Sequence, residues 1–190
     1  MVDGYFSDVS LSYMGCIHVH WHDNTQALHD AGLSTSQNQL SESDRDRVGV
    51  AVGAGMSCTT ELAAAGVLLQ AGQLRRLSPY FIPRVLVNTP AAAISMAHGL
   101  KGPLHAASTA CATGAHAVGD AFRMIQCGDA EVMVCGGTEA CIDAVSLGGF
   151  SRLRALSTRF NDEPHLASRW VLSLGLRELR DEVGVRVRAT

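Results

Sequence analysis

Residues 104–126 read LHAASTACATGAHAVGDAFRMIQ, and this stretch decides the fold that we expect. Small and apolar residues come first, followed by a Thr-Ala-Cys-Ala-Thr-Gly corner and then by apolar residues at the spacing of one helix face. The stretch therefore predicts a strand, a tight corner and a helix. The apolar run at residues 130–137 predicts the next strand, and strand–helix–strand units favour parallel pairing in an α/β layer fold.

Cys111 is the candidate nucleophile of this corner. A thiol at the first turn of a helix lies among backbone N–H groups without helical partners, near the positive end of the helix dipole, and both stabilise a thiolate. Ala110, Ala112 and Gly114 are small enough to let a substrate approach closely. An isolated cysteine more often packs in a core, but these surroundings favour the reactive role.

Several further elements follow from local patterns. Residues 25–33 predict the end of a helix closed by Gly32, and residues 34–46 a polar connection. Residues 47–56 predict a strand buried on both faces, residues 61–73 a helix, and residues 85–98 a helical stretch interrupted by a proline. Prolines break regular structure twice at residues 78–83, and residues 101–103 form a turn that leads into the central strand.

Composition limits the classes of partner. The chain has 190 residues, 47% of them hydrophobic, which is enough for one domain with a core. Its formal net charge is -3, and no apolar run has the length of a membrane span, so we expect neither nucleic acid nor a membrane as partner. The six cysteines form no CxxC pair, which favours thiols in a reducing compartment.

We expect no metal and no cofactor. His18, His20 and His22 would share one face of a strand, where imidazoles can bind a metal, but a solvated strand face or a tail explains them equally well. No other ligand group converges on these histidines in the sequence. Residues 53–55 (Gly-Ala-Gly) lack the third glycine and the acidic residue of a dinucleotide-binding fingerprint.

Residues 108–116 (STACATGAH) and 128–140 (GDAEVMVCGGTEA) resemble the nucleophile region of the β-ketoacyl-acyl-carrier-protein synthases, most closely the bacterial type II and mitochondrial enzymes. The resemblance implies a thiolase-like layered α/β fold, of which this chain holds the N-terminal half. It also implies that Cys111 accepts an acyl group from acyl carrier protein as a thioester. A malonyl-derived carbanion then takes up that group, which extends a fatty acid by two carbons.

The same resemblance implies three substrate-binding residues. Met56 follows a glycine-rich corner and lines the acyl pocket, although core packing explains it as well. Phe81, in the SPYFIP segment of residues 78–83, would reach across a homodimer interface and close the partner's acyl pocket. Phe150, in a Gly-Gly-Phe sequence, matches a residue beside the acyl channel.

The resemblance divides the chain into three parts. Residues 1–25 are an unmatched N-terminal segment, residues 26–169 an incomplete synthase N-terminal domain, and residues 170–190 a divergent tail. The family takes two histidines and a lysine for condensation from its second half, and we expect His105 and His116 to pack locally instead of replacing them. The chain is therefore expected to be inactive alone in condensation.

Two alternatives remain open. The chain can be a non-catalytic fragment that binds a full-length synthase or acyl carrier protein. A cysteine hydrolase or thiolase-type acyltransferase is a third reading, but no base lies near Cys111 in the sequence.

Only the resemblance indicates a compartment for this chain. It implies the mitochondrion, and the cytoplasm is the alternative. No transit peptide is visible, because the first residues include Asp3 and Asp8 and no arginine precedes Arg45.

Overall fold

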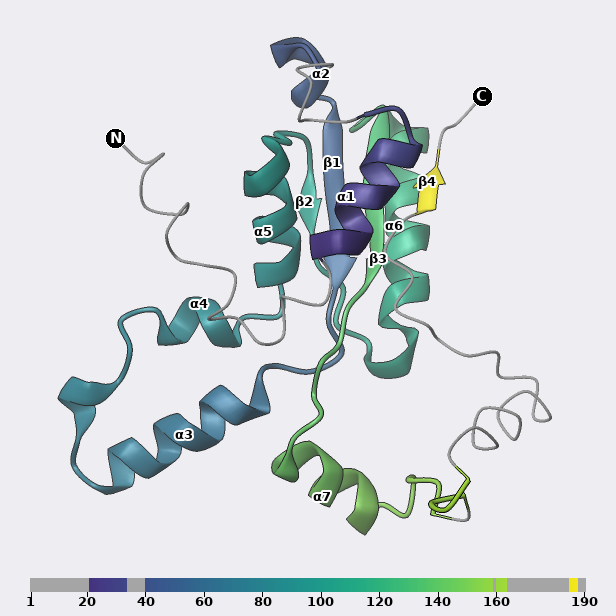
Figure 1. Ribbon diagram of the computed structural model, residues 1–190. Coiled ribbons are helices and arrows are strands. Elements are labelled where there is room, and N and C mark those ends of the chain that lie inside the picture. The colour runs from purple at the N-terminus through teal and green to yellow at the C-terminus, as the bar shows by residue number, and fades with distance from the viewer. Residues whose placement is uncertain (1–20, 34–39, 159, 164–184, 188–190) are drawn as a thin grey trace. The chain divides into compact units, whose positions relative to one another are not determined.

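The structure is a computed structural model that describes residues 21–33, 40–158, 160–163 and 185–187 (Figure 1). The chain divides into two compact units, one that ends at Cys141 and also takes in the C-terminal strand, and one that begins at Ile142. The helices are α1 (Trp21–Asp30), α2 (Glu42–Arg45), α3 (Thr59–Gln70), α4 (Phe81–Val85), α5 (Thr89–His98), α6 (Thr113–Cys127) and α7 (Ala144–Arg152). The short 3-10 helices are η4 (Leu74–Arg76) and η5 (Ala110–Ala112), and the strands are β1 (Val48–Gly53), β2 (Leu104–His105), β3 (Val132–Gly137) and β4 (Val185–Val187).

The strands form one sheet in the order β2-β1-β3-β4. Strand β1 pairs in parallel with both β2 and β3, and β4 pairs antiparallel with β3. All six residues of β1 are buried, as its unbroken apolar run predicts for a strand covered on both faces. The expected α/β layer fold with parallel strands is thus confirmed.

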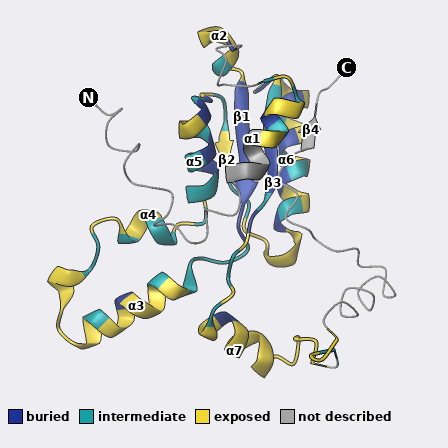
Figure 2. Cartoon of the chain, in the orientation of Figure 1, coloured by how far each residue is buried: buried dark blue, intermediate teal, exposed yellow. Residues whose placement is uncertain are grey.

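Helices cover both faces of this sheet, and each covered face has its own core (Figure 2). Val50 and Val52 of β1 pack in one cluster with Ile94 of α5 and Leu28 of α1. Ala51, which points to the opposite face, packs in the other cluster with residues of α6, such as Ala121 and Ile125. The alternation of side chains along β1 therefore assigns α5 and α6 to opposite faces.

The strand that leads to Cys111 differs from our prediction. We expected residues 101–103 to enter the central strand, but β2 has only two residues, both exposed, and it lies at an edge of the sheet. Residues 106–110 are small or polar, with little apolar surface to extend a strand across the core. The central position belongs to β1.

Most predicted helices are present, with shifted ends. Helix α1 spans Trp21–Asp30. Gly32 follows it with a left-handed φ of 70°, as expected for a glycine after a helix. Because α1 begins at Trp21, it runs across the boundary that we predicted after residue 25. Helix α3 begins two residues before the predicted start and ends at Gln70, followed by η4.

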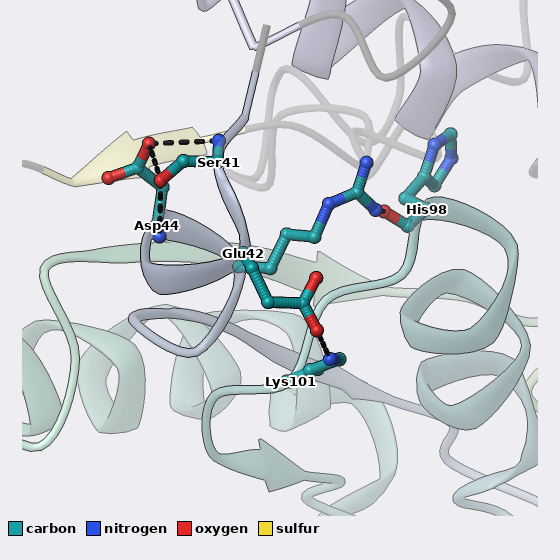
Figure 3. A network of polar contacts seen from close by, with 6 residues as sticks. Ser41, Glu42, Asp44, His98 and Lys101 are labelled. Carbon is teal, nitrogen blue, oxygen red and sulfur yellow. Dashed lines mark hydrogen bonds and ion pairs between the residues drawn. The ribbon is translucent and has the colours of Figure 1, made fainter. Parts of the chain in front are cut away.

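Two short helices correct the sequence-based prediction. The polar connection at residues 34–46 contains α2, whose N-cap Ser41 and Asp44 form a capping box (Figure 3). Hydrogen bonds from Ser41 lower the pKa of the Asp44 carboxyl below its usual value. The second is α4, where Pro83 is the third residue; a proline fits there because the first N–H groups of a helix have no helical acceptor.

Replacing Gly137 with alanine is expected to destabilise the fold. A Cβ at Gly137 would lie 2.9 Å from the Gly114 Cα in α6, and neither backbone can move without opening the sheet–helix contact. Overpacking of this kind costs about 1 to 3 kcal/mol, which urea unfolding followed by circular dichroism measures.

Gly119→Ala, in α6, is the control. A Cβ at Gly119 meets nothing within 4 Å, so this variant is expected to gain up to about 1 kcal/mol from helix propensity. Equal destabilisation of both variants would contradict the close approach at Gly137.

Acid is expected to weaken the fold through His98, the last residue of α5. His98 is 5% exposed, and this burial lowers the pKa of its imidazole. Below pH about 6.5 the unfolded chain therefore binds a proton that the folded chain does not yet bind, so stability is lost as the pH falls through that value. Urea midpoints between pH 7.5 and 5.5 should fall for the natural chain and less for His98→Gln. The same decline in both would assign the acid sensitivity elsewhere.

Candidate active site

Cys111 lies where three parallel strands end. The carboxyl ends of β1, β2 and β3 share one edge of the sheet, the usual place for ligand sites in open α/β sheets. Cys111 is the middle residue of η5, which passes directly into α6, and its side chain is exposed. The predicted strand, corner and helix are thus present, with the thiol in a 3-10 turn just before the helix.

The turn holds a backbone conformation that non-glycine residues seldom adopt. Ala110, immediately before Cys111, has a φ of 52° in the left-handed region. Such strain persists only where the surroundings enforce it, and it is concentrated at functional sites. Its effect here is to turn the chain sharply between β2 and α6.

The Thr113 side chain stabilises this turn through two hydrogen bonds. Its buried hydroxyl accepts the Thr109 N–H at 2.8 Å and donates to the Ala110 carbonyl at 2.7 Å. A ring nitrogen of His116 also forms a 2.8 Å hydrogen bond with the Thr109 hydroxyl. Thr109 and Ala110 are therefore tied to α6 on both sides of the strained residue.

Glycines bring the loops of this edge together. Gly114 of α6 lies against Gly137 at the end of β3, where a Cβ on Gly137 would come too close to the Gly114 backbone. A Cβ at Gly55 would lie 3.2 Å from the Ala110 carbonyl oxygen and 2.8 Å from a Glu139 carboxylate oxygen. The loop after β1 therefore contacts both the Cys111 turn and the segment after β3.

A small pocket lies between the loops after β1 and β3, and Met56 lines it. Its free volume is about 40 Å³, which has room for only a few water molecules. Its wall consists of Ala54, Met56, Ser57, Cys58, Arg84, Leu86, Val87, Thr89, Pro90, Thr138, Glu139, Ala140 and Cys141. Cys111 and Phe81 are not among these residues, so the pocket does not join all the residues that we predicted.

Glu139, in the segment after β3, has an exposed side chain that joins two loops. Its Oε2 accepts the Met56 N–H at 3.0 Å, and its Oε1 accepts the Cys141 thiol at 3.1 Å. Glu139 thus supports the pocket wall by joining the loop after β1 to the segment after β3.

The two predicted phenylalanines lie in different units of the chain. Phe81 is the first residue of α4 and is half-buried. Phe150 belongs to α7, in the unit that begins at Ile142, and is 41% exposed. Their contact with an acyl chain stays a prediction.

The histidines near Cys111 in sequence are both exposed, so neither packs in the core. His105 is in β2 and His116 in α6, where its hydrogen bond to Thr109 is local. Of the predicted histidine face, residues 18 and 20 lie outside the described residues, and residue 22 belongs to α1 rather than to a strand. Across the described ranges, no group of three His, Cys, Asp or Glu side chains converges as a metal site.

Two further cysteines, Cys135 and Cys141, lie in and just after β3. Burial raises the pKa of the Cys135 thiol to about 11, which fits a packing role for Cys135 in β3. Cys141 is half-buried in the pocket wall. In the part of the chain that the structure describes, no helix has the length and apolar character needed to cross a membrane.

Comparison with known proteins identifies the family. The family model "Beta-ketoacyl synthase, N-terminal domain" matches residues 18–169, most of the chain. The chain belongs to the β-ketoacyl synthase family. It is 53% identical over 144 residues to the mitochondrial 3-oxoacyl-[acyl-carrier-protein] synthase of Arabidopsis thaliana, an alignment that covers 76% of this chain and 30% of that protein. It is also 48% identical to 3-oxoacyl-[acyl-carrier-protein] synthase 2 of Rhizobium meliloti, over 75% of this chain and 33% of that protein.

Solved β-ketoacyl synthase structures agree with this assignment. A β-ketoacyl synthase from Burkholderia phymatum superposes with a TM-score of 0.66 at 32% identity, over 76% of this chain and 34% of that one. A ketosynthase in complex with its type II PKS acyl-carrier protein gives a TM-score of 0.58 at 25% identity, over 81% of this chain and 40% of that one. The predicted thiolase-like fold is thus confirmed. The chain spans about a third of the length of its curated synthase relatives.

The sequence of this synthase chain predicts Cys111 as the nucleophile, and it did not indicate the residues that hold the Cys111 turn. The hydroxyl of Thr113 and the left-handed Ala110 carry no motif of their own. A threonine at the start of the predicted helix was the available signal, since such hydroxyls often bond to nearby backbone groups.

Thr113→Val is expected to disturb the Cys111 turn. Valine keeps the shape of the side chain but leaves the Thr109 N–H without its acceptor, at a cost of about 1 to 3 kcal/mol. It also removes the hydroxyl bond to the Ala110 carbonyl, which still accepts the Thr113 backbone N–H. Urea unfolding measures the loss, and mass spectrometry of iodoacetamide labelling measures the changed alkylation rate of Cys111. Thr113→Ser keeps the hydroxyl and should restore both values. A valine variant that behaves like the natural chain would show that the Thr113 hydroxyl does not hold the turn.

Proposed function

We propose that this chain performs the acyl-accepting step of a β-ketoacyl-acyl-carrier-protein synthase. The observation that carries the proposal is the exposed Cys111 thiol in a strained turn, held by Thr113 where α6 begins. The curated relatives are 3-oxoacyl-[acyl-carrier-protein] synthases, which supports an acyl thioester as the substrate.

In the proposed step, the Cys111 thiol gives up its proton to solvent, and the thiolate attacks the carbonyl carbon of an acyl thioester on acyl carrier protein. The tetrahedral oxyanion is proposed to form beside the first turn of α6, where the positive end of the helix dipole stabilises the developing negative charge. Collapse of the intermediate forms the Cys111 thioester and releases the carrier thiolate, which takes up a proton. In the complete reaction, a carbanion from malonyl-acyl carrier protein attacks this thioester and extends the chain by two carbons. The proposal assigns the decarboxylation to no residue of this chain.

The acyl chain is proposed to contact Met56, Phe81 and Phe150. Met56 is in the pocket wall, and the preceding residue, Gly55, lies beside the carbonyl of Ala110, which precedes Cys111. These contacts connect the pocket to the nucleophile turn.

The synthase is proposed to act as a homodimer in its complete form. The unit that ends at Cys141 exposes apolar side chains around the segment that holds Phe81, including Val67 at 67% and Ile82 at 59% exposure. Apolar surface of this kind usually marks an interface, which agrees with Phe81 reaching a partner's pocket.

A second candidate function is non-catalytic binding. The chain covers about a third of the relatives' length, and the exposed apolar residues on α3 and α4 suit binding to a full-length synthase. Binding to acyl carrier protein is the other form of this alternative, since one structural relative is a ketosynthase in complex with such a carrier.

A mitochondrial location is proposed on the same similarity. Relatives in Arabidopsis thaliana and Schizosaccharomyces pombe carry the description "mitochondrial", whereas bacterial relatives support the cytoplasm as the alternative. Fractionation of cells that express the natural gene distinguishes the two.

Incubation of the full chain with an acyl thioester of acyl carrier protein is expected to acylate Cys111. Intact-mass spectrometry should show one acyl adduct, and peptide mapping should place it on Cys111. Cys111→Ala should lose the adduct while circular dichroism shows that it stays folded.

Cys127→Ala is the matched control, because Cys127 is also exposed but lies at the far end of α6. This variant should be acylated like the natural chain. If the folded natural chain takes up no acyl group yet co-purifies with a full-length synthase, the non-catalytic function replaces acyl transfer.

A further inference from the structure

Two cysteines that acyl transfer does not use lie in the wall of the same pocket. Cys58 comes from the loop after β1 and is the N-cap residue of α3. Cys141 comes from the segment after β3. The fold therefore brings together two thiols that are far apart in the sequence, in a pocket of only about 40 Å³.

A direct contact shows how near the two residues are. The Cys141 thiol donates to the Ser57 carbonyl oxygen, with 3.6 Å between sulfur and oxygen. Ser57 is bonded to Cys58, and standard backbone dimensions then place the Cys141 sulfur within about 6.5 Å of the Cys58 Cα. A disulfide requires Cβ atoms about 3.8 Å apart, so the proposed bond needs the two loops to bring the Cβ atoms of Cys58 and Cys141 to this separation.

Both thiols are also accessible to a small reagent. Cys58 and Cys141 are half-buried and are thiols in this structure, whereas Cys135 is fully buried. The exposed Cys111 and Cys127 are reachable too, but neither is in the pocket wall. Only Cys58 and Cys141 combine access with a second cysteine in the same pocket, among the residues that the structure describes.

We propose that Cys58 and Cys141 form a reversible disulfide across this pocket when the chain meets a low-molecular-weight disulfide such as oxidised glutathione. In the first exchange, the thiolate of one cysteine attacks the reagent, forms a mixed disulfide and releases one small thiol. The second cysteine then attacks the protein-bound sulfur and releases the other small thiol. The two cysteines lose two protons and two electrons, and the oxidised reagent takes up both as two thiols.

The bond would tie the loop after β1 to the segment after β3. These two segments already meet through the Met56 N–H and Glu139, so the bond adds a covalent link to an existing contact. It encloses residues 59–140, a long loop whose closure restricts the unfolded chain. The inference goes beyond acyl transfer and does not depend on it, because neither exchange step uses Cys111.

The test treats the folded full chain with oxidised glutathione and then blocks the remaining thiols with N-ethylmaleimide. Digestion with trypsin and Glu-C cuts after Glu131 and Glu139, so Cys135 and Cys141 fall on different peptides. Mass spectrometry should find a Cys58–Cys141 linked peptide that a reducing agent removes. The oxidised chain should also unfold at a higher urea concentration than the reduced chain.

Cys58→Ser and Cys141→Ser should each abolish the linked peptide and leave a glutathione adduct on the remaining cysteine, whereas Cys127→Ser should form the link unchanged. The same oxidation in 8 M urea gives the pairing of an unfolded chain as a reference. A folded chain that yields glutathione adducts without the link, or pairs its cysteines as the unfolded chain does, would overturn the proposal. Neither outcome bears on Cys111 acylation, so the two proposals fail separately.

Discussion

The close approach of α6 to the end of β3 is the constraint on which the site depends. Gly114 and Gly137 meet backbone to backbone, because Gly137 carries no Cβ, which would lie 2.9 Å from the Gly114 Cα. This contact fixes where α6 begins, and the η5 turn with Cys111 precedes that point directly. The Thr113 hydroxyl, anchored at the start of the same helix, can then hold Ala110 in its left-handed conformation. The position of α6 against β3 thus sets where the strained Ala110 and the exposed Cys111 thiol lie.

The loop after β1 connects the nucleophile turn to the rest of this edge. Gly55 lies beside the Ala110 carbonyl, and the next residue, Met56, is held by the Glu139 carboxylate. A displacement of the loops after β1 and β3 relative to each other would therefore alter the position of the Cys111 turn as well as the pocket. Acyl transfer and disulfide formation are proposed for different cysteines, yet both depend on this one meeting of loops.

Helix α3 exposes apolar side chains that its sequence pattern predicts to be buried. The apolar positions of α3 predict a buried helix face, but among the residues of α3 only Ala65 is buried, while Leu62 and Leu69 are exposed. A helix of this composition is stabilised mainly when another surface covers it. Since the chain spans about a third of its relatives' length, a partner surface is the natural complement to this helix in the proposed dimer.

The sequence by itself determined the layer fold, the buried strand β1, and Cys111 as the nucleophile candidate. These features depend on local periodicity and on small residues around one thiol, which one stretch of chain displays. The short edge strand β2, the exposure of Glu139 and the bracing by Thr113 were decided by tertiary structure, because each depends on contacts between segments distant in sequence or on which surfaces stay uncovered. The presence of Cys58 and Cys141 in one pocket wall was also decided by tertiary structure. Parallel strands carry the loops that follow them to one edge of the sheet, whatever the number of residues between the loops.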